Sequence, residues 1–134
     1  ASSILEADPN LISIFPGVGA STEEGIRVTR LDEAVRQFGI DIFPPLLVKL
    51  DVQGYEDRVI LGGKRTISQA AVVITEVSFV TLYREQALFG RVYSLLTELG
   101  FRYIGNLHEM ANPVNGQPVQ ADAVFLKAHA AESR

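Results

Sequence analysis

The chain of 134 residues predicts an α/β fold with a mainly parallel sheet. Two short apolar runs, 46–50 and 71–75, are typical of buried strands, and the second is unalternating and rich in Val and Ile. Helical periodicity occupies the stretches 31–38, 55–69 and 88–99. Strands that alternate with helices favour parallel pairing, because parallel neighbours need a long crossover connection.

The first 30 residues contain two strand-like runs and the start of a helix. Residues 11–15 and 26–28 are short apolar runs near turn-forming residues, so we expect both to be strands. Thr29 and Asp32 resemble a capping box, although the usual final residue of that motif is Glu or Gln. The helix that they begin is expected to end at Gly39.

The stretch Tyr55–Gln69 is expected to be one helix with a pair of glycines near its middle. Each glycine costs roughly 1 kcal/mol against alanine in a helix interior. Such a cost indicates close packing or a kink at Gly62 and Gly63. The residues that this helix is expected to bury are Val59, Ile60 and Ile67.

The last two strands are expected at 101–104 and 123–126. No helix separates them, which favours an antiparallel closing pair. The intervening segment 105–121 carries His108 and is long enough to be a substrate loop. A histidine on such a loop is also commonly just solvated.

Composition excludes several classes of function. A net charge of -4, from 16 acidic and 12 basic residues, and the lack of a basic cluster argue against nucleic acid as a partner. The sequence has no apolar stretch near the roughly 20 residues of a membrane span and no secretory signal pattern, so we expect a cytoplasmic protein without a membrane partner. Zero cysteines and two distant histidines exclude thiolate-based and histidine-based metal centres, while a carboxylate-only site stays possible.

Size and the first residues bear on domain organisation. The length favours a single domain over residues 1–134 with one core. The sequence starts at Ala1, without a methionine, and enters loop-like residues directly, which suggests a piece of a longer protein.

Acidic residues follow both of the central strands. Asp51 ends the first apolar run and Glu76 ends the second. Ligands of open parallel sheets bind beyond the carboxyl ends of the strands, so both carboxylates are candidate site residues. The alternative interpretation is that Asp51 caps the following helix.

Three further residues near Asp51 could have either a structural or a functional role. Lys49 shares a sheet face with Asp51. Its ammonium group either pairs with a carboxylate, Asp51 or Glu76, or reaches water at the end of an extended side chain. Glu56 in the first turn of a helix is favoured by the macrodipole whatever the function. Gly54 is expected to provide a backbone conformation or a close approach that a side chain would block.

Six blocks of sequence together resemble one family, the FkbM-type methyltransferases, in order and spacing. They cover about residues 27–127 and are Thr29–Glu33, Leu47–Glu56, Leu61–Gly63, Thr75–Val77 with Leu82–Tyr83, Leu99–Phe101, and Gln120–Phe125. The resemblance implies S-adenosylmethionine as methyl donor and O-methylation of a small-molecule or sugar hydroxyl. It also implies a Rossmann-like class I methyltransferase sheet, mostly parallel with an antiparallel final strand.

Two departures from the family pattern affect this expectation. The commonest pattern after the strand is Asp-Val-Glu-Gly, and Gln53 stands here in place of the Glu, which removes one candidate base. The glycine-rich donor-binding loop and the acid that holds the ribose have no counterpart, so the chain resembles the C-terminal half of the domain and lacks the cofactor-binding half. The strand at 46–50 would then expose an apolar edge, which we expect the missing N-terminal half or a second copy to cover.

We hypothesise a role in methyl transfer for each candidate residue. Asp51 would face the donor methyl and orient or deprotonate the acceptor, with Glu76 as the second catalytic carboxylate and Val52 beside the cofactor. The acceptor pocket would involve Gln53, Tyr83 and His108.

Three alternatives stay open at this point. Asp51 and Glu76 could jointly hold a divalent cation, which insensitivity to chelators would disprove. The chain could be a binding or assembly module without catalysis. It could also be an unrelated nucleotide-binding domain, which calorimetry with S-adenosylhomocysteine against NAD would distinguish.

Overall fold

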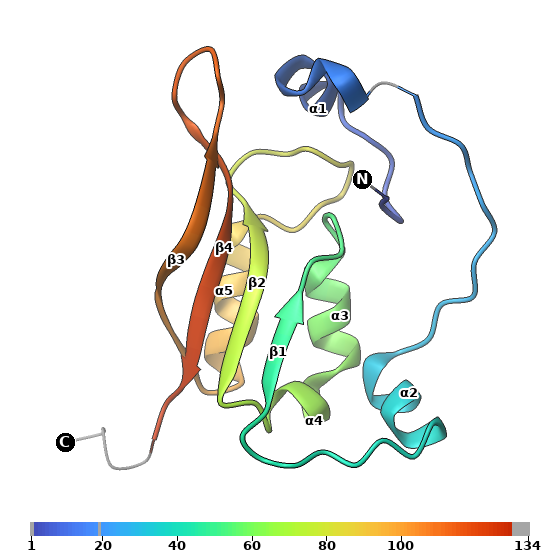
Figure 1. Cartoon of the computed structure of the whole chain (residues 1–134), viewed down its shortest axis with the longest axis vertical. Coiled ribbons are helices and arrows are strands. Elements are labelled where there is room, and N and C mark those ends of the chain that lie inside the picture. The colour runs from blue at the N-terminus through green and yellow to red at the C-terminus, as the bar shows by residue number, and fades with distance from the viewer. Residues whose placement is uncertain (1, 19, 130–134) are drawn as a thin grey trace.

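The computed structural model describes residues 2–18 and 20–129. Its helices and strands follow in the order α1 (Pro9–Ile14), the short 3-10 helix η1 (Pro16–Val18), α2 (Leu31–Gln37), β1 (Leu47–Leu50), α3 (Glu56–Gly62), α4 (Lys64–Ile67), β2 (Val72–Ser78), α5 (Phe89–Glu98), β3 (Phe101–Ala111) and β4 (Pro118–Lys127). These strands form one sheet with the order β1-β2-β4-β3, so β1 lies at an edge, as Figure 1 shows.

The α/β class is confirmed, but the sheet is mixed, so the prediction of a mostly parallel sheet is confirmed only in part. β1 and β2 pair in parallel, whereas β4 pairs antiparallel with both β2 and β3. The final strand is antiparallel, as predicted. Because it inserts between β2 and β3, it makes two of the three strand pairings antiparallel even though β1, β2 and β3 all run in one direction.

One face of the sheet carries the core. In β2, Val73, Thr75 and Val77 are buried, and Val73 and Val77 join Ile60 of α3 and Leu96 of α5 in the main apolar cluster. On the opposite face, Val72, Ile74 and Glu76 of β2 are partly exposed. In Figure 1, α3 and α5 lie behind the sheet, so this second face is turned toward the viewer. The strand period therefore separates the core from the residues available for chemistry.

The helix predicted over Tyr55–Gln69 is broken into α3 and α4 at Gly63. A Cβ atom on Gly63 would lie 2.7 Å from Leu31 Cδ2 of α2 and 3.0 Å from the Val59 carbonyl oxygen. Close packing and a kink are thus both found at the glycine pair, as its unfavourable helix propensity indicated. Ile60 and Ile67 are fully buried, as predicted.

Asp32 does not form the predicted capping box. Arg30 is the N-cap of α2 and makes no side-chain capping bond. The Asp32 carboxylate instead accepts hydrogen bonds from the backbone N–H groups of Arg65 and Thr66, at 3.0 and 2.8 Å, and from the Thr66 hydroxyl at 2.7 Å. It therefore ties α2 to the beginning of α4.

The N-terminal strand predictions were also wrong. Residues 9–14 form α1, whose N-cap Asp8 accepts a hydrogen bond from the Asn10 backbone and is followed by a proline at the first helical position. Residues 26–28 form no strand, and the side chains of Ile26 and Val28 are largely exposed.

The segment 105–121 is a hairpin and not a substrate loop. β3 and β4 pair from Phe101 to Ala111, and only a short turn connects them. Register shifts interrupt the pairing at three places, which hides the strand alternation in the sequence. His108 consequently lies on a strand.

Within residues 2–18 and 20–129, no helix combines the length and apolar character needed to cross the bilayer. The longest helix in these residues is α5, which has 10 residues.

We predict opposite effects for alanine at two glycines. Gly63→Ala should lower the free energy of unfolding by about 1–3 kcal/mol, because its methyl group would overlap Leu31 and the Val59 carbonyl. Gly90→Ala in the first turn of α5 meets nothing within 4 Å and should be neutral or stabilising by up to about 1 kcal/mol. Urea denaturation of both variants checks this, and equal effects would contradict the packing at Gly63.

Candidate active site

The turn after β1 is closed by a buried carboxylate. Glu56 is 3% exposed and accepts hydrogen bonds from the backbone N–H groups of Val52 and Gly54, both at 3.0 Å. Burial raises the pKa of Glu56, against the effect of these hydrogen bonds. Glu56 is in the first turn of α3 as predicted, but its structural role is larger than a favourable dipole interaction because it satisfies two turn donors.

Gly54 serves both purposes that the sequence indicated. Its φ of +99° lies in the region that favours glycine, and a Cβ atom would approach Tyr83 Cδ2 to 3.2 Å. The preceding residue, Gln53, also has a positive φ of 52° although it is not glycine. The turn therefore holds two successive residues in left-handed conformations.

Lys49 and Asp51 pair with each other at the sheet edge. Lys49 Nζ donates to Asp51 Oδ2 at 3.3 Å, and the two side chains are 51% and 44% exposed. Asp51 does not cap the next helix, because the N-cap of α3 is Tyr55. Both interpretations of Lys49 therefore hold, because its ammonium group has a carboxylate partner and its side chain is still half exposed to water.

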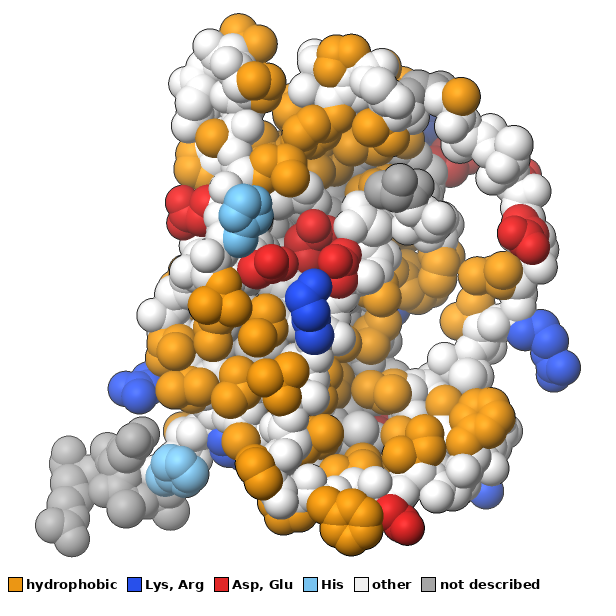
Figure 2. All heavy atoms as spheres, in the orientation of Figure 1, with side chains coloured by type: hydrophobic (Ala, Val, Ile, Leu, Met, Phe, Trp, Pro, Cys, Tyr) orange, Lys and Arg blue, Asp and Glu red, His pale blue; other side chains and the backbone are white. Residues whose placement is uncertain are grey.

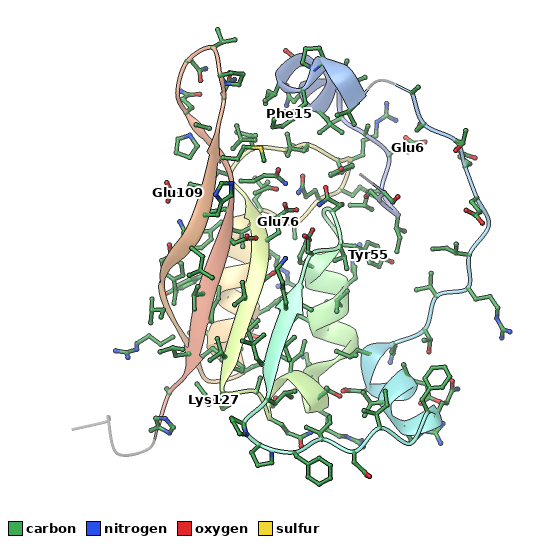
Figure 3. All side chains as sticks on the ribbon, in the orientation of Figure 1. Glu6, Phe15, Tyr55, Glu76, Glu109 and Lys127 are labelled. Atoms are coloured by element: carbon green, nitrogen blue, oxygen red, sulfur yellow. The ribbon has the colours of Figure 1, made fainter. Side chains whose placement is uncertain are left out.

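Glu76 lies within β2 and not at its end, because the strand continues to Ser78. Burial raises the pKa of Glu76 to about 7, and the negative charges of Asp51, Glu56 and Asp122 add to this effect while Lys49 opposes it. Its side chain lies on the partly exposed face of β2, where Figure 3 labels it. A carboxyl group with this pKa exchanges its proton at neutral pH.

Gln53 connects Glu76 to two other predicted residues. Its Nε2 donates to Asp51 Oδ1 at 2.9 Å and to Glu76 Oε2 at 3.2 Å, and its Oε1 accepts from the Tyr83 hydroxyl at 3.1 Å. Burial raises the pKa of Tyr83, and the negative charges of Glu76 and Glu56 raise it further. The Tyr83 hydroxyl therefore keeps its proton.

A hollow of about 90 Å³ opens on the exposed sheet face beside these groups. Sheet register sets Glu76 opposite Asp122 on β4, and Asp122 opposite His108 on β3. Figure 2 shows the acidic side chains gathered on this face with a basic side chain below them and a histidine beside them. The residues that line the hollow are Asp51, Glu76, His108, Met110, Gln120, Ala121 and Asp122.

The structure thus brings most of the predicted site residues together. Asp51, Glu76 and His108 share the hollow, and Gln53 links Tyr83 to the two carboxylates. Val52 does not line the hollow, and its N–H is engaged by Glu56.

Sequence reasoning missed Asp122 as a site residue. The segment before it was predicted to be a loop, so no register linked it to Glu76. The turn signal Asn115-Gly116 between apolar strands could have indicated a hairpin and revealed the alternation that exposes Asp122.

Among the described residues, no group of three or more His, Cys, Asp or Glu side chains is arranged to hold a metal ion. A hydrogen-bond donor, the Gln53 amide, contacts both Asp51 and Glu76. This amide would compete with any cation that the two carboxylates shared, because its nitrogen already donates to both.

Comparison with known proteins shows the family of the chain. The sequence model of the methyltransferase FkbM domain matches residues 8–103. The chain belongs to the FkbM methyltransferase family. A curated relative, the 2-O-methyltransferase NoeI of Sinorhizobium fredii (strain NBRC 101917 / NGR234), is 30% identical over 95 residues. The match covers 71% of this chain and 38% of NoeI, so the chain spans well under half of that relative. No solved structure matches.

We predict that Glu76→Gln changes stability in a pH-dependent way. The folded chain binds the Glu76 proton with a pKa of about 7 against an ordinary value of 4.5, so this contribution to stability is full below about pH 4.5 and is lost as the pH rises through 7. Glu76→Gln should therefore stabilise the fold at pH 8 by about 1–3 kcal/mol, after allowance for solvent screening, and have a much smaller stabilising effect at pH 4.5.

Urea denaturation at both pH values measures this difference. Glu98→Gln, at an exposed position at the end of α5, is the matched control and should show no pH-dependent gain. An equal effect of Glu76→Gln at both pH values would contradict the raised pKa.

Proposed function

We propose that the protein is an S-adenosylmethionine-dependent O-methyltransferase that acts on a hydroxyl group of a small molecule or sugar. Family membership supports methyl transfer, and the 2-O-methyltransferase named among its relatives supports oxygen as the acceptor. The chain covers 38% of that relative, so the cofactor and the acceptor class belong to this proposal.

The observation that carries the proposal is the state of Glu76 in the hollow. A general base works best when its pKa lies near the working pH, and the pKa of Glu76 is raised to about 7 by burial and neighbouring charges. Asp51, whose side chain is 44% exposed, lies within reach of the same Gln53 amide. The site therefore combines a carboxyl group tuned for proton transfer with a second, more exposed carboxylate.

The residues present fit the reactive end of the donor. S-adenosylmethionine supplies a methyl group on a positively charged sulfur, and the half-exposed Asp51 carboxylate offers that charge a favourable neighbour. We propose that Asp51 and the adjacent Val52 contact the donor. A hollow of about 90 Å³ is well below the roughly 300–1,000 Å³ of small-molecule sites, so further parts of the protein would complete the donor site.

In the proposed reaction, an acceptor hydroxyl lies in the hollow against Glu76. The bound donor would supply the methyl group, which would pass from its sulfur to the acceptor oxygen, and the Glu76 carboxylate would take the hydroxyl proton. Asp51 orients the hydroxyl toward the methyl group. His108 lies on the acceptor side of the hollow, and Tyr83 acts through Gln53.

The exposed edge of the sheet supports a proposal about partners. β1 has β2 on one side, and Leu47 on β1 is 56% exposed. We propose that the N-terminal half of a methyltransferase domain or a second copy of the chain covers the strand at 46–50. Light scattering separates the two, because a second copy doubles the particle mass and a fused half does not.

Replacing the carboxylates tests the mechanism. Asp51→Asn should lower turnover by at least about 100-fold while calorimetric binding of S-adenosylhomocysteine stays within a few-fold of wild type. Glu76→Gln should cause a loss of similar size. The assay is transfer of labelled methyl from S-adenosylmethionine to a panel of sugars and small alcohols.

Glu98→Gln provides the control, since this exposed residue lies at the end of α5. Unchanged turnover in Asp51→Asn would remove Asp51 from the mechanism. Unchanged turnover in Glu76→Gln would remove the proposed base.

A further inference from the structure

The Gln53 amide stands between the two carboxylates of the site. Nε2 lies 2.9 Å from Asp51 Oδ1 and 3.2 Å from Glu76 Oε2. We propose that Gln53 is a positioning residue that holds Asp51 and Glu76 side by side, and that Tyr83 fixes the direction in which its amide points. The consequence for catalysis rests on the proposed function, whereas the effect on the carboxylates does not.

The hydrogen-bonding chemistry favours one orientation of this amide while both carboxyl groups are ionised. Its nitrogen carries two hydrogens and can donate one to each carboxylate, while its oxygen can only accept. The reverse orientation would turn the oxygen toward Asp51 and Glu76, which are acceptors when ionised. Tyr83, which keeps its proton, donates to Oε1 at 3.1 Å and stabilises the orientation that directs Nε2 toward the carboxylates.

The backbone of the turn places the amide there. Gln53 has a φ of +52°, a region that residues with a side chain rarely occupy, and Gly54 follows with a φ of +99°. The buried carboxylate of Glu56 accepts from the N–H groups on both sides of Gln53. Ser3 adds a hydrogen bond from its hydroxyl to the Gln53 carbonyl oxygen at 2.7 Å. Contacts on the backbone and on the amide thus define the position of this one side chain.

The charges around Glu76 explain what the amide does. Asp51, Glu56 and Asp122 face Glu76 with negative charge, and Lys49 opposes them. His108 lines the same hollow across β4. Lys49 is hydrogen-bonded to Asp51. The Gln53 amide supplies Glu76 with an uncharged donor, which favours the ionised form of Glu76 and lessens the repulsion between it and Asp51.

Glutamine and glutamate at position 53 should therefore have opposite effects on the pKa of Glu76: glutamine lowers it and glutamate raises it. A glutamate side chain in this position would direct carboxylate oxygens at Asp51 and Glu76, where Gln53 now directs a donor. The amide is a functional component of this site and not merely a missing base.

The experiment is a carbon-13 NMR titration of the Glu76 side-chain carboxyl in the purified protein. The wild-type midpoint should lie near 7. Gln53→Ala should move it upward by roughly one pH unit, because the ionised form loses a donor. Gln53→Glu should move it further upward, and Tyr83→Phe should cause a smaller upward shift because the amide is then free to turn.

Two variants separate this role from a structural one. Gln53→Asn retains an amide but is one methylene group shorter, and asparagine tolerates the left-handed backbone well, so it should fold and still shift the midpoint upward. Gln37→Ala removes another glutamine that donates to a glutamate, Glu33, on the exposed face of α2, and should leave the Glu76 midpoint unchanged.

Midpoints in Gln53→Ala and Gln53→Asn that equal the wild-type value would overturn the proposal. The titration needs no substrate, so it separates this proposal from the proposed function. Shifted midpoints in a protein that transfers no methyl group would support the role of Gln53 and reject the enzymatic assignment.

Discussion

The carboxylate of Glu56 in the turn after β1 is the interaction on which the site depends. The backbone N–H groups of Val52 and Gly54 have few other ways to be satisfied in a buried turn, and a buried donor without a partner costs about 1–3 kcal/mol. By accepting from both, Glu56 offsets its own desolvation and fixes the conformation of the residue between them. The direction of the Gln53 side chain, and with it the separation of Asp51 and Glu76, follows from this turn.

Sheet register provides the second constraint. Glu76, Asp122 and His108 lie side by side because β2, β4 and β3 pair in one fixed register. A slip of one residue would turn these side chains into the core and expose apolar ones. The antiparallel insertion of β4 thus has an electrostatic consequence, since it brings Asp122 beside Glu76 and raises the pKa of Glu76 further. The helices on the other face hold the register through Val73, Val77 and Phe125.

Local patterns in the sequence were sufficient for part of this arrangement. The apolar runs and the stripe of α5 predicted the central strands and the helical layer, and Asp51, Gly54 and Glu76 were identified from their positions after or near strand ends. Those features depend on near neighbours in sequence. The glycine pair likewise predicted the close packing found at Gly63.

Other features depend on contacts between distant residues, and the sequence did not predict them. The antiparallel pairing of the last two strands was predicted, but the segment 105–121 was mistaken for a loop because bulges interrupt its alternation, so Asp122 was not connected to Glu76. The apolar residues 11–14 were assigned to a strand although Asp8 and Pro9 form a helix start. Gln53 appeared to remove a base, and its bonds to Asp51, Glu76 and Tyr83 were visible only in the fold.

We propose that Glu76 takes the acceptor proton with a pKa set by its surroundings. The measurement that decides this is the pH dependence of kcat/KM for methyl transfer. We expect a rate that rises with pH through a single ionisation near 7, and we expect this ionisation to be absent from the residual rate of Glu76→Gln. A flat profile from pH 5 to 9, or the same ionisation in Glu76→Gln, would contradict it.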